Sequence, residues 1–257
     1  MEFIKTEQRE NVLIITLNRP NKLNALNRSV IGELSEHLKQ NRANDDVKAI
    51  IITGEGESAF AAGADISEFQ EYPTKEAILM AKRGHEVFNR VENYPKPIVA
   101  AVNGFCLGGG CELAMATHFR VCSNNAKFGQ PEVNLGLIPG YGGTQRLPQL
   151  IGKGKAMEML LTGDIIDAEQ AKQLGLVNYI FPQEKLVDET VKILQKIIKK
   201  APLAITEIIN AVNAFYKKDV DGFDKEIQSF GELFETDDFK EGTEAFINKR
   251  PPLFKGL

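Results

Sequence analysis

The sequence predicts an α/β fold, with a parallel sheet followed by a mainly helical tail. Short β-branched runs alternate with longer stretches whose apolar residues recur at helical spacing. Strands separated by helices of this length need crossover connections, and such connections are typical of parallel sheets. After about residue 150 the strand signals become rare and helical patterns dominate. No linker, internal repeat or low-complexity segment is visible between the two parts.

The first half of the chain carries most of the predicted strands. Strands are expected at residues 12–17, 47–53, 98–102 and 120–122, and helices at residues 27–40 and 75–92. The residues expected to face the core from these two helices are Val30, Ile31, Leu34, Leu38, Ile78, Leu79, Val87, Phe88 and Val91. Short segments rich in Pro, Gly and Asn interrupt the patterns, which supports these bounds.

The C-terminal part is predicted to be almost entirely helical. Helices are expected at residues 153–161, 168–174, 186–200, 202–216, 223–234 and 238–248. Residues 176–180 form the only strand predicted after residue 150. They follow Gly175, which is expected to end the preceding helix as its C′ residue.

Composition and charge narrow the class of protein. The 257 residues are 43% apolar and 26% charged, which is typical of globular domains and excludes disordered, collagen-like and coiled-coil chains. The net charge of −4 argues against a nucleic-acid-binding protein. Three cysteines and three scattered histidines argue against a disulfide framework and a metal site. Without a signal sequence, a transit sequence or an apolar run of about 20 residues, the protein is expected to be cytoplasmic.

Two glycine-containing segments follow predicted strands. They are FAAGADI at residues 60–66 and NGFCLGGGCELA at residues 103–114. Glycine at the start of a helix lets a ligand approach bare backbone N–H groups. Two such turns placed side by side would direct two N–H donors at one oxygen, which is an oxyanion hole. The alternative is that the glycines only permit tight turns or close packing, and the residues alone leave both interpretations open.

Two glutamates are candidate acid–base residues. Glu112 lies within an apolar stretch, where burying a carboxylate without partners is costly, although it could instead face the positive end of a helix dipole. Glu132 lies in the Pro- and Gly-rich residues 128–144, which predict an ordered loop, and its alternative is an exposed loop carboxylate. Two carboxylates at one pocket can share acid and base work, because different surroundings separate their pKa values.

Several other polar and sulfur-containing residues are expected to have structural roles. Arg146 is expected to hydrogen-bond within the fold, and His118 to pack or to cap a helix. Lys249 stands beside an arginine and could contact phosphates, although such pairs are more often plain surface charge. Cys106 and Cys111 are expected to be small buried apolar residues.

In its ordered motifs the sequence resembles the enoyl-CoA hydratase (crotonase) family. The matching segments cover nearly the whole chain and begin with Asn18-Arg19-Pro20 and Leu23-Asn24-Ala25-Leu26. The later segments are AAGADISEF at 61–69, KPIVAAVNGFCLGGGCELAMA at 96–116, AKFGQPEVNLGLIPGYGGTQRLPQLIG at 126–152, TGDIIDAEQAKQLGLVN at 162–178 and FINKR at 246–250. The resemblance implies an α/β, crotonase-like spiral of ββα units at residues 1–195 and a helical trimerisation region at residues 196–257.

The resemblance also implies a substrate and a site. The substrate is an acyl-CoA thioester, and the backbone N–H groups of Ala64 and Gly109 bind its thioester oxygen. Glu112 and Glu132 occupy the positions of the family's two catalytic glutamates. The implied substrate-binding residues are Ala62, Ala64, Asp65, Ile66, Ser67, Gly109 and Lys249. Neither a metal nor a separate cofactor is implied, since coenzyme A is part of the substrate.

Two residues depart from the family pattern. Ser67 stands where many relatives have a lysine that can meet CoA phosphates, so this contact is in doubt. His118 stands where relatives often have an aspartate, and a local structural change is expected there.

The expected reaction is reversible hydration of trans-2-enoyl-CoA to 3-hydroxyacyl-CoA, in a homotrimer or in a homohexamer built as a dimer of trimers. Glu112 is expected to deprotonate the water and Glu132 to deliver a proton to the α-carbon. The alternative within the fold is double-bond isomerisation, which commonly needs one carboxylate, so Glu112 argues against it. An RNA-binding homologue is disfavoured by the net charge of −4 and by the glutamate pair, and no membrane contact is expected.

Overall fold

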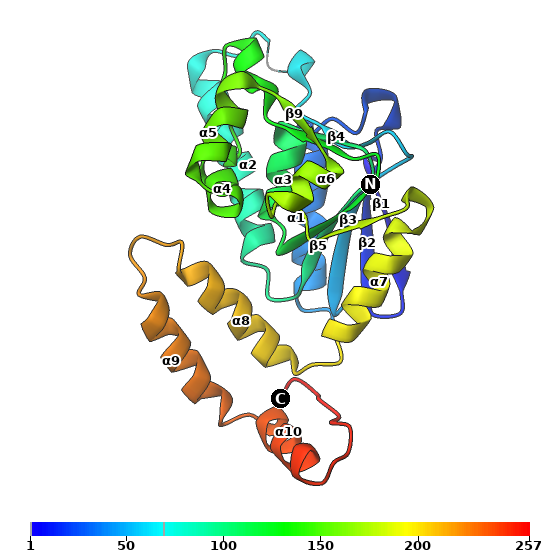
Figure 1. Ribbon diagram of the computed structural model, residues 1–257, viewed down its shortest axis with the longest axis vertical. Coiled ribbons are helices and arrows are strands. Elements are labelled where there is room, and N and C mark those ends of the chain that lie inside the picture. Colours follow the sequence, from blue (N-terminus) through cyan, green and yellow to red (C-terminus); the bar gives the residue numbers. More distant parts are fainter. Residues whose placement is uncertain (1, 69) are drawn as a thin grey trace.

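The computed structural model describes residues 2–68 and 70–257 (Figure 1). Its strands are β1 (Ile4–Arg9), β2 (Val12–Leu17), β3 (Ala49–Gly54), β4 (Ala59–Ala62), β5 (Ile98–Val102), β6 (Phe105–Leu107), β7 (Phe119–Ser123), β8 (Lys127–Gly129), β9 (Ile165–Asp167) and β10 (Tyr179–Phe181). Its α-helices are α1 (Arg28–Arg42), α2 (Thr74–Glu92), α3 (Gly109–Ala116), α4 (Gly143–Ile151), α5 (Lys153–Thr162), α6 (Ala168–Gln173), α7 (Leu186–Ile197), α8 (Pro202–Ala214), α9 (Gly222–Leu233) and α10 (Asp237–Ile247). Short 3-10 helices include η2 (Ile66–Glu68) and η3 (Pro131–Leu135).

The strands form two sheets. The larger sheet has the order β1-β2-β3-β5-β7-β10, in which β1 is antiparallel to β2 and the other neighbours are parallel. The smaller sheet has the order β4-β6-β8-β9, and its last strand, β9, runs antiparallel to β8. The predicted α/β architecture with parallel strand pairing is therefore confirmed.

The sequence patterns located the larger sheet better than the smaller one. The strands β2, β3, β5 and β7 lie within a few residues of their expected positions, because central parallel strands read as continuous apolar runs. The strands of the smaller sheet have three or four residues each, which is too short for a recognisable pattern. The prediction of a single strand after residue 150 is wrong, since β9 also lies there, and β10 begins later than predicted.

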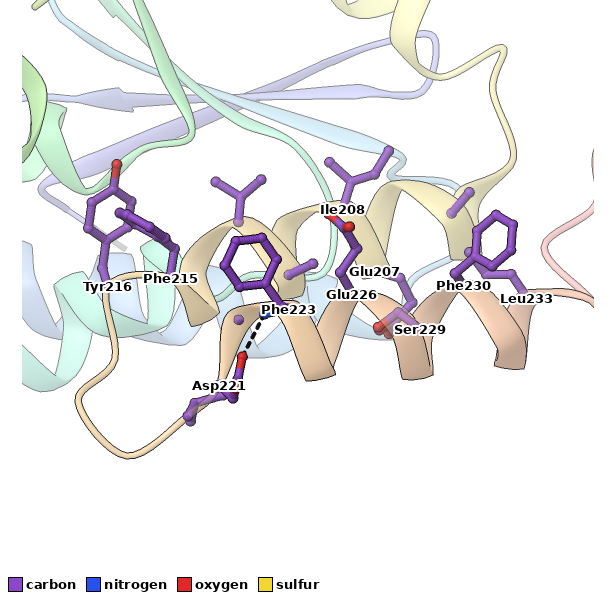
Figure 2. A pocket seen from close by; sticks show the side chains of 15 residues that line it. Glu207, Ile208, Phe215, Tyr216, Asp221, Phe223, Glu226, Ser229, Phe230 and Leu233 are labelled. Atoms are coloured by element: carbon purple, nitrogen blue, oxygen red, sulfur yellow. Dashed lines mark hydrogen bonds between the residues drawn. The ribbon is translucent and has the colours of Figure 1, made fainter.

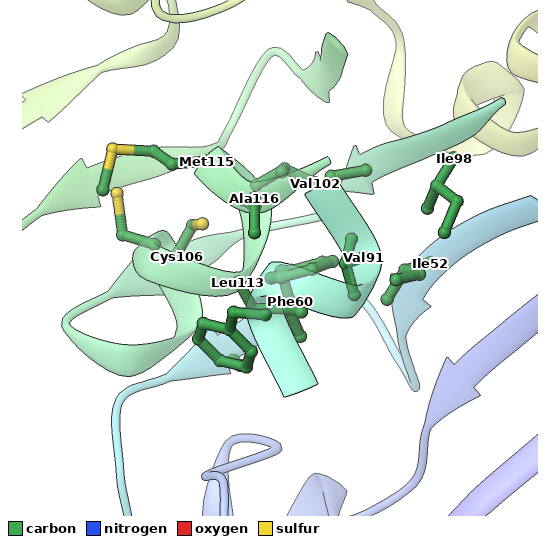
Figure 3. Close-up of a cluster of buried hydrophobic side chains, with 14 of the residues drawn as sticks. Ile52, Phe60, Val91, Ile98, Val102, Cys106, Leu113, Met115 and Ala116 are labelled. Carbon is green, nitrogen blue, oxygen red and sulfur yellow. The ribbon is translucent and has the colours of Figure 1, made fainter. Parts of the chain in front are cut away.

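Apolar side chains pack on both faces of the larger sheet. On one face, helices α1, α2 and α3 cover a large cluster that includes Ile52, Phe60 and Leu113 (Figure 3). On the other face, α7 covers a smaller cluster that includes Val99 and Leu194. This layering places α3 directly against β4.

The residues predicted to face the core are all buried in α1 but only partly so in α2. All four predicted positions of α1 are buried. In α2, Val87, Phe88 and Val91 are buried as predicted. The prediction is wrong for Ile78 and Leu79, which are 51% and 42% exposed. The first turns of α2 are exposed throughout. The apolar residues there have helical spacing, but no other described part of this chain packs on them to form a core.

Helices α8, α9 and α10 form an extension that lies beyond α7, apart from the two sheets (Figure 1). Two hydrogen bonds tie α8 to the end of α2 and to the loop after it. Asn213 Nδ2 donates to the Glu92 carbonyl at 2.6 Å, and Thr206 Oγ1 donates to the Pro95 carbonyl at 2.8 Å. All three predicted helices are present here within a few residues. The division into residues 1–195 and 196–257 stays a prediction. Within the described ranges, no helix has both the length and the apolar character needed to cross a bilayer.

Candidate active site

Helix α3 begins against β4 because glycine allows an unusually close approach. A methyl group on Gly110 would overlap the carbonyl oxygen of Ala61 in β4. Gly108, the N-cap of α3, has φ +49° and ψ −125°, a backbone conformation that favours glycine. The N-terminus of α3 is therefore held beside the segment that follows β4.

The structure brings the amides of Ala64 and Gly109 together. The Leu26 N–H donates to the Gly63 carbonyl, and the Asp65 N–H donates to the Leu26 carbonyl, both at 2.8 Å. Successive N–H groups of an extended segment point to opposite sides, so the Ala64 N–H is directed away from Leu26. A Cβ atom on Gly109 would lie 3.5 Å from the Ala64 nitrogen. Because Gly109 opens α3, its own N–H has no intrahelical acceptor.

Glu112 is buried with two backbone donors. Its side chain is on α3, and the residue is only 1% exposed. The N–H groups of Tyr141 and Gly143 both donate to its Oε1, each at 2.7 Å. These two bonds offset part of the cost of burying a carboxylate and explain how an apolar helix accommodates a glutamate.

Glu132 approaches the same place from η3. A Cβ atom on Gly108 would lie 2.7 Å from Glu132 Oε1, so the carboxyl packs against the N-terminus of α3. Glu132 Oε2 is buried and has no hydrogen-bond partner among the described residues. Buried polar atoms are normally hydrogen-bonded, so an unpaired carboxyl oxygen indicates a place where a ligand or water binds.

A cavity of about 170 Å³ lies between these groups. Both glutamates line it, together with Ala64 and Gly109. The remaining lining residues are Ala62, Gly63, Ile66, Met80, Leu107, Gly108, Pro131, Leu135, Leu137, Ile138, Gly140 and Tyr141. One small, largely apolar cavity is therefore lined by both glutamates and by Ala64 and Gly109, the two residues whose N–H groups were expected to form an oxyanion hole.

Comparison with known proteins identifies the family. Residues 7–257 match the family model described as enoyl-CoA hydratase/isomerase. The chain belongs to this family. It is 44% identical to the crotonyl-CoA hydratase of Syntrophomonas wolfei, with 98% of each chain covered. It is also 44% identical to the short-chain-enoyl-CoA hydratase of Clostridium acetobutylicum, covering 95% of this chain and 94% of the relative.

Solved structures of the family have the same fold. The crystal structure of enoyl-CoA hydratase from Bacillus anthracis superimposes with a TM-score of 0.94 at 36% identity, covering 99% of this chain and all of that one. A Geobacillus kaustophilus structure of an enoyl-CoA hydratase gives a TM-score of 0.93 at 40% identity, and both chains are covered completely. The crotonase-like fold implied by the motifs is confirmed.

Three of the substrate-binding residues implied by the family motifs do not line the cavity, namely Asp65, Ser67 and Lys249. Asp65 pairs with Arg19 at 2.8 Å and accepts a hydrogen bond from Ser67 Oγ at 2.6 Å. The bonds from Ser67 and Arg19 hold the pKa of Asp65 below its usual value. Lys249 is exposed after α10, on the helical extension. The substrate contacts of these three residues stay a prediction, whereas Ala62, Ala64, Ile66 and Gly109 do line the cavity.

Burial is the main influence on both glutamates. It raises the pKa of Glu112 to about 7, and the nearby charge of Glu132 adds to this rise. The N–H donors of Gly143 and Tyr141 and the charge of Arg146 act in the opposite direction. Burial also raises the pKa of Glu132. Two carboxyls with raised pKa values in one cavity are suited to acid–base catalysis.

The sequence patterns missed α4, which begins at the two donors of Glu112. The helix starts with Gly142 as N-cap and contains Pro148, so no helix was predicted there, and its first two residues fell within the loop expected at residues 128–144. Arg146 on this helix is buried and hydrogen-bonds within the fold, as predicted. The useful signal was its position directly after the Gly143-Thr144-Gln145 turn.

The predicted burial of Cys106 and Cys111 is confirmed, and His118 makes a structural contact within the fold. His118 accepts a hydrogen bond from the Ile98 N–H at Nδ1, at 2.9 Å, and burial lowers its pKa to about 4. Cys106, Cys111 and Cys122 are buried and unpaired. In the part of the chain that the structure describes, no three His, Cys, Asp or Glu side chains are grouped as metal ligands would be.

Proposed function

We propose that this protein is an enoyl-CoA hydratase, which adds water reversibly to trans-2-enoyl-CoA to give 3-hydroxyacyl-CoA. The observation that carries the proposal is the single cavity lined by Glu112, Glu132, Ala64 and Gly109. The relatives named crotonyl-CoA hydratase and short-chain-enoyl-CoA hydratase, each 44% identical, support the same reaction. Isomerisation has weaker support, because two carboxyl groups face the cavity rather than one.

The paired amides supply the electrophilic part of the mechanism. The thioester oxygen accepts hydrogen bonds from the N–H groups of Ala64 and Gly109. When water adds to the β-carbon, electrons of the C=C bond move toward this oxygen and form an enolate. Both N–H groups interact more strongly with the enolate than with the neutral carbonyl, and this difference lowers the barrier.

The two glutamates move the protons. Ionised Glu112 removes one proton from the attacking water, whose hydroxyl bonds to the β-carbon. Protonated Glu132 delivers its proton to the α-carbon, which restores the neutral thioester. Burial favours a proton on both carboxyls, so the pair can hold one proton. The two N–H donors on Glu112 Oε1 favour its ionised form, so we assign the base to Glu112 and the acid to Glu132. The cycle ends with the proton on Glu112, and it returns to Glu132 before the next turnover.

Crotonyl-CoA provides the direct test of the function. The purified protein is expected to remove the absorbance of the conjugated enoyl thioester as water adds. Migration of the double bond in a 3-enoyl-CoA, without any hydration, would instead establish the isomerase alternative. RNA retention on a filter that weakens steeply with salt would favour the RNA-binding alternative.

We expect kcat/KM to follow a bell-shaped pH profile. A doubly protonated pair has no base and a doubly ionised pair has no acid, so only the pair with one proton is active. Below about pH 7 Glu112 gains its proton and activity falls, since its pKa is raised to about 7. Measurement of crotonyl-CoA hydration from pH 5 to pH 10 would show this, and a rate independent of pH below 7 would contradict it.

We further propose that the protein is a homotrimer, or a hexamer built from two trimers. A hollow of about 730 Å³ lies between α8 and α9, and Figure 2 shows Phe223 and Phe230 beside it. These two side chains are 78% and 67% exposed in the single chain, and Phe246 on α10 is 86% exposed. Monomeric proteins rarely expose contiguous apolar surfaces of this kind. The trimerising tail implied by the family motifs would cover them.

Light scattering tests the assembly. The wild-type protein is expected to have three or six times the 28.5 kDa mass of the chain. Phe223→Asp is expected to lower this mass, because a charge in the hollow cannot be buried against a second copy. Leu161→Asp replaces another exposed apolar residue, on α5 and outside the hollow, and is expected to leave the mass unchanged. A wild-type mass of 28.5 kDa would contradict the proposal.

We also propose that the reaction needs no cofactor beyond the coenzyme A of its substrate. The two amides and two carboxyls account for every bond made or broken in the proposed hydration. A cytoplasmic location is proposed as well. The three buried, unpaired cysteines support it, because reducing compartments keep thiols free.

A further inference from the structure

Arg146 joins the loop before α4 to helix α2. Its Nη1 donates to the Tyr141 carbonyl at 3.0 Å, and its Nε and Nη2 donate to the two carboxylate oxygens of Glu92 at 3.1 and 2.9 Å. Nη2 also donates to Asn89 Oδ1 at 2.7 Å. A bidentate arginine–carboxylate pair fixes both position and plane of the guanidinium, which lysine cannot do.

The loop held by Arg146 is the one that binds Glu112. The Tyr141 N–H and the Gly143 N–H donate to Glu112 Oε1, and Arg146 Nη1 donates to the carbonyl of Tyr141. Gly142, between the two donors, has φ +110°, and a methyl group there would overlap the guanidinium of Arg146. The guanidinium therefore packs on the turn that directs both donors at the carboxylate.

We infer that Arg146 is a positioning residue for the hydration that we propose above. It holds residues 141–143 against α2, and this loop holds the Glu112 carboxylate toward the attacking water. Arg146 does not line the cavity, so it acts through the loop and through its charge rather than by touching the substrate.

The charged and titratable groups around Glu112 come from several elements. Glu132 on η3 raises the pKa of Glu112, whereas Arg146 on α4 lowers it. Tyr141 contributes its N–H to Glu112 and packs its ring on Phe88 of α2. From α2, Glu92 pairs with the guanidinium, and His85 lies beside Gly142, where burial and Arg146 lower the pKa of its imidazole. Arg146 is thus the cation whose removal would raise the pKa of Glu112.

Two substitutions separate the geometry of Arg146 from its charge. Arg146→Lys keeps the positive charge but loses the bidentate pair with Glu92, so kcat for crotonyl-CoA is expected to fall by up to about 100-fold. The fall in activity on the acid side of the pH profile is expected to stay at the same pH. Arg146→Gln loses both the charge and the bidentate pair. Its kcat is expected to fall similarly, and the loss of activity on the acid side is expected to move to higher pH, because the pKa of Glu112 rises. KM is expected to change little in both variants.

A matched control and a direct titration complete the test. Arg120→Lys also weakens a buried arginine that donates to backbone carbonyls, and it is expected to lower the Tm without moving kcat or the pH profile. The ¹³C-labelled carboxyl of Glu112 reports its own pKa without turnover, so the inference is testable even if crotonyl-CoA is not hydrated. An unchanged Glu112 titration in Arg146→Gln, or the same kcat loss in Arg120→Lys, would overturn the positioning role.

Discussion

Glu112→Gln is expected to lower kcat for hydration of crotonyl-CoA by roughly 1,000-fold, within the range that a positioned general base contributes. Glutamine has almost the same shape, and its side-chain oxygen can still accept the N–H groups of Tyr141 and Gly143. The variant therefore keeps the fold and loses only the ability to take a proton from water. Steady-state kinetics together with the thermal unfolding midpoint would measure both properties.

Glu132→Gln provides the companion measurement. It removes the proton that the α-carbon receives, so a similar loss of kcat is expected. The double variant is expected to be little worse than either single one, because the two residues act as a unit in one proton cycle. Near-normal hydration by either single variant would show that the two-carboxylate mechanism is wrong.

Gly110→Ala is expected to produce the largest loss of stability, more than about 3 kcal/mol in the free energy of unfolding, or no folded protein at all. The added methyl group overlaps the Ala61 carbonyl, and neither backbone can yield without separating α3 from β4. The same separation would part the amides of Ala64 and Gly109. Urea unfolding of the purified variant measures the stability change.

Gly154→Ala is the control for this substitution. Gly154 lies in α5, and a methyl group there would have no other atom within 4 Å. Since alanine restricts the unfolded chain more than glycine does, this variant is expected to be as stable as the wild type or slightly more stable. Equal stability of Gly110→Ala and Gly154→Ala would disprove the close-packing explanation.

The sequence alone was most informative where a residue's environment follows from local periodicity. The buried faces of α1 and of the second half of α2 repeat every three or four residues. The strand β5 is an unbroken apolar run, and β3 is apolar from Ala49 to Ile52. The first turns of α2 show the limit of this reasoning. Ile78 and Leu79 have suitable spacing for a core face, but the core does not reach them.

In the site, too, some features followed from local sequence and others did not. The glycine segments, Glu112 and Glu132 were recognisable as candidates from residue type and from the family motifs. Asp65 belongs to the glycine segment at residues 60–66, yet its carboxylate pairs with Arg19, a residue 46 positions earlier in the chain. No local pattern could have indicated that partner.

The amino-acid sequence by itself determined the α/β class, the family and the pair of glutamates, because these depend on burial periodicity and on ordered motifs. Tertiary structure decided which groups meet: the Tyr141 amide reaches Glu112 across 29 positions, and Arg146 reaches Glu92 across 54. The physical reason is that hydrogen bonding and desolvation act over a few ångströms in space. The environment that raises the pKa of Glu112 to about 7 therefore exists only after α3, η3 and α4 have packed together.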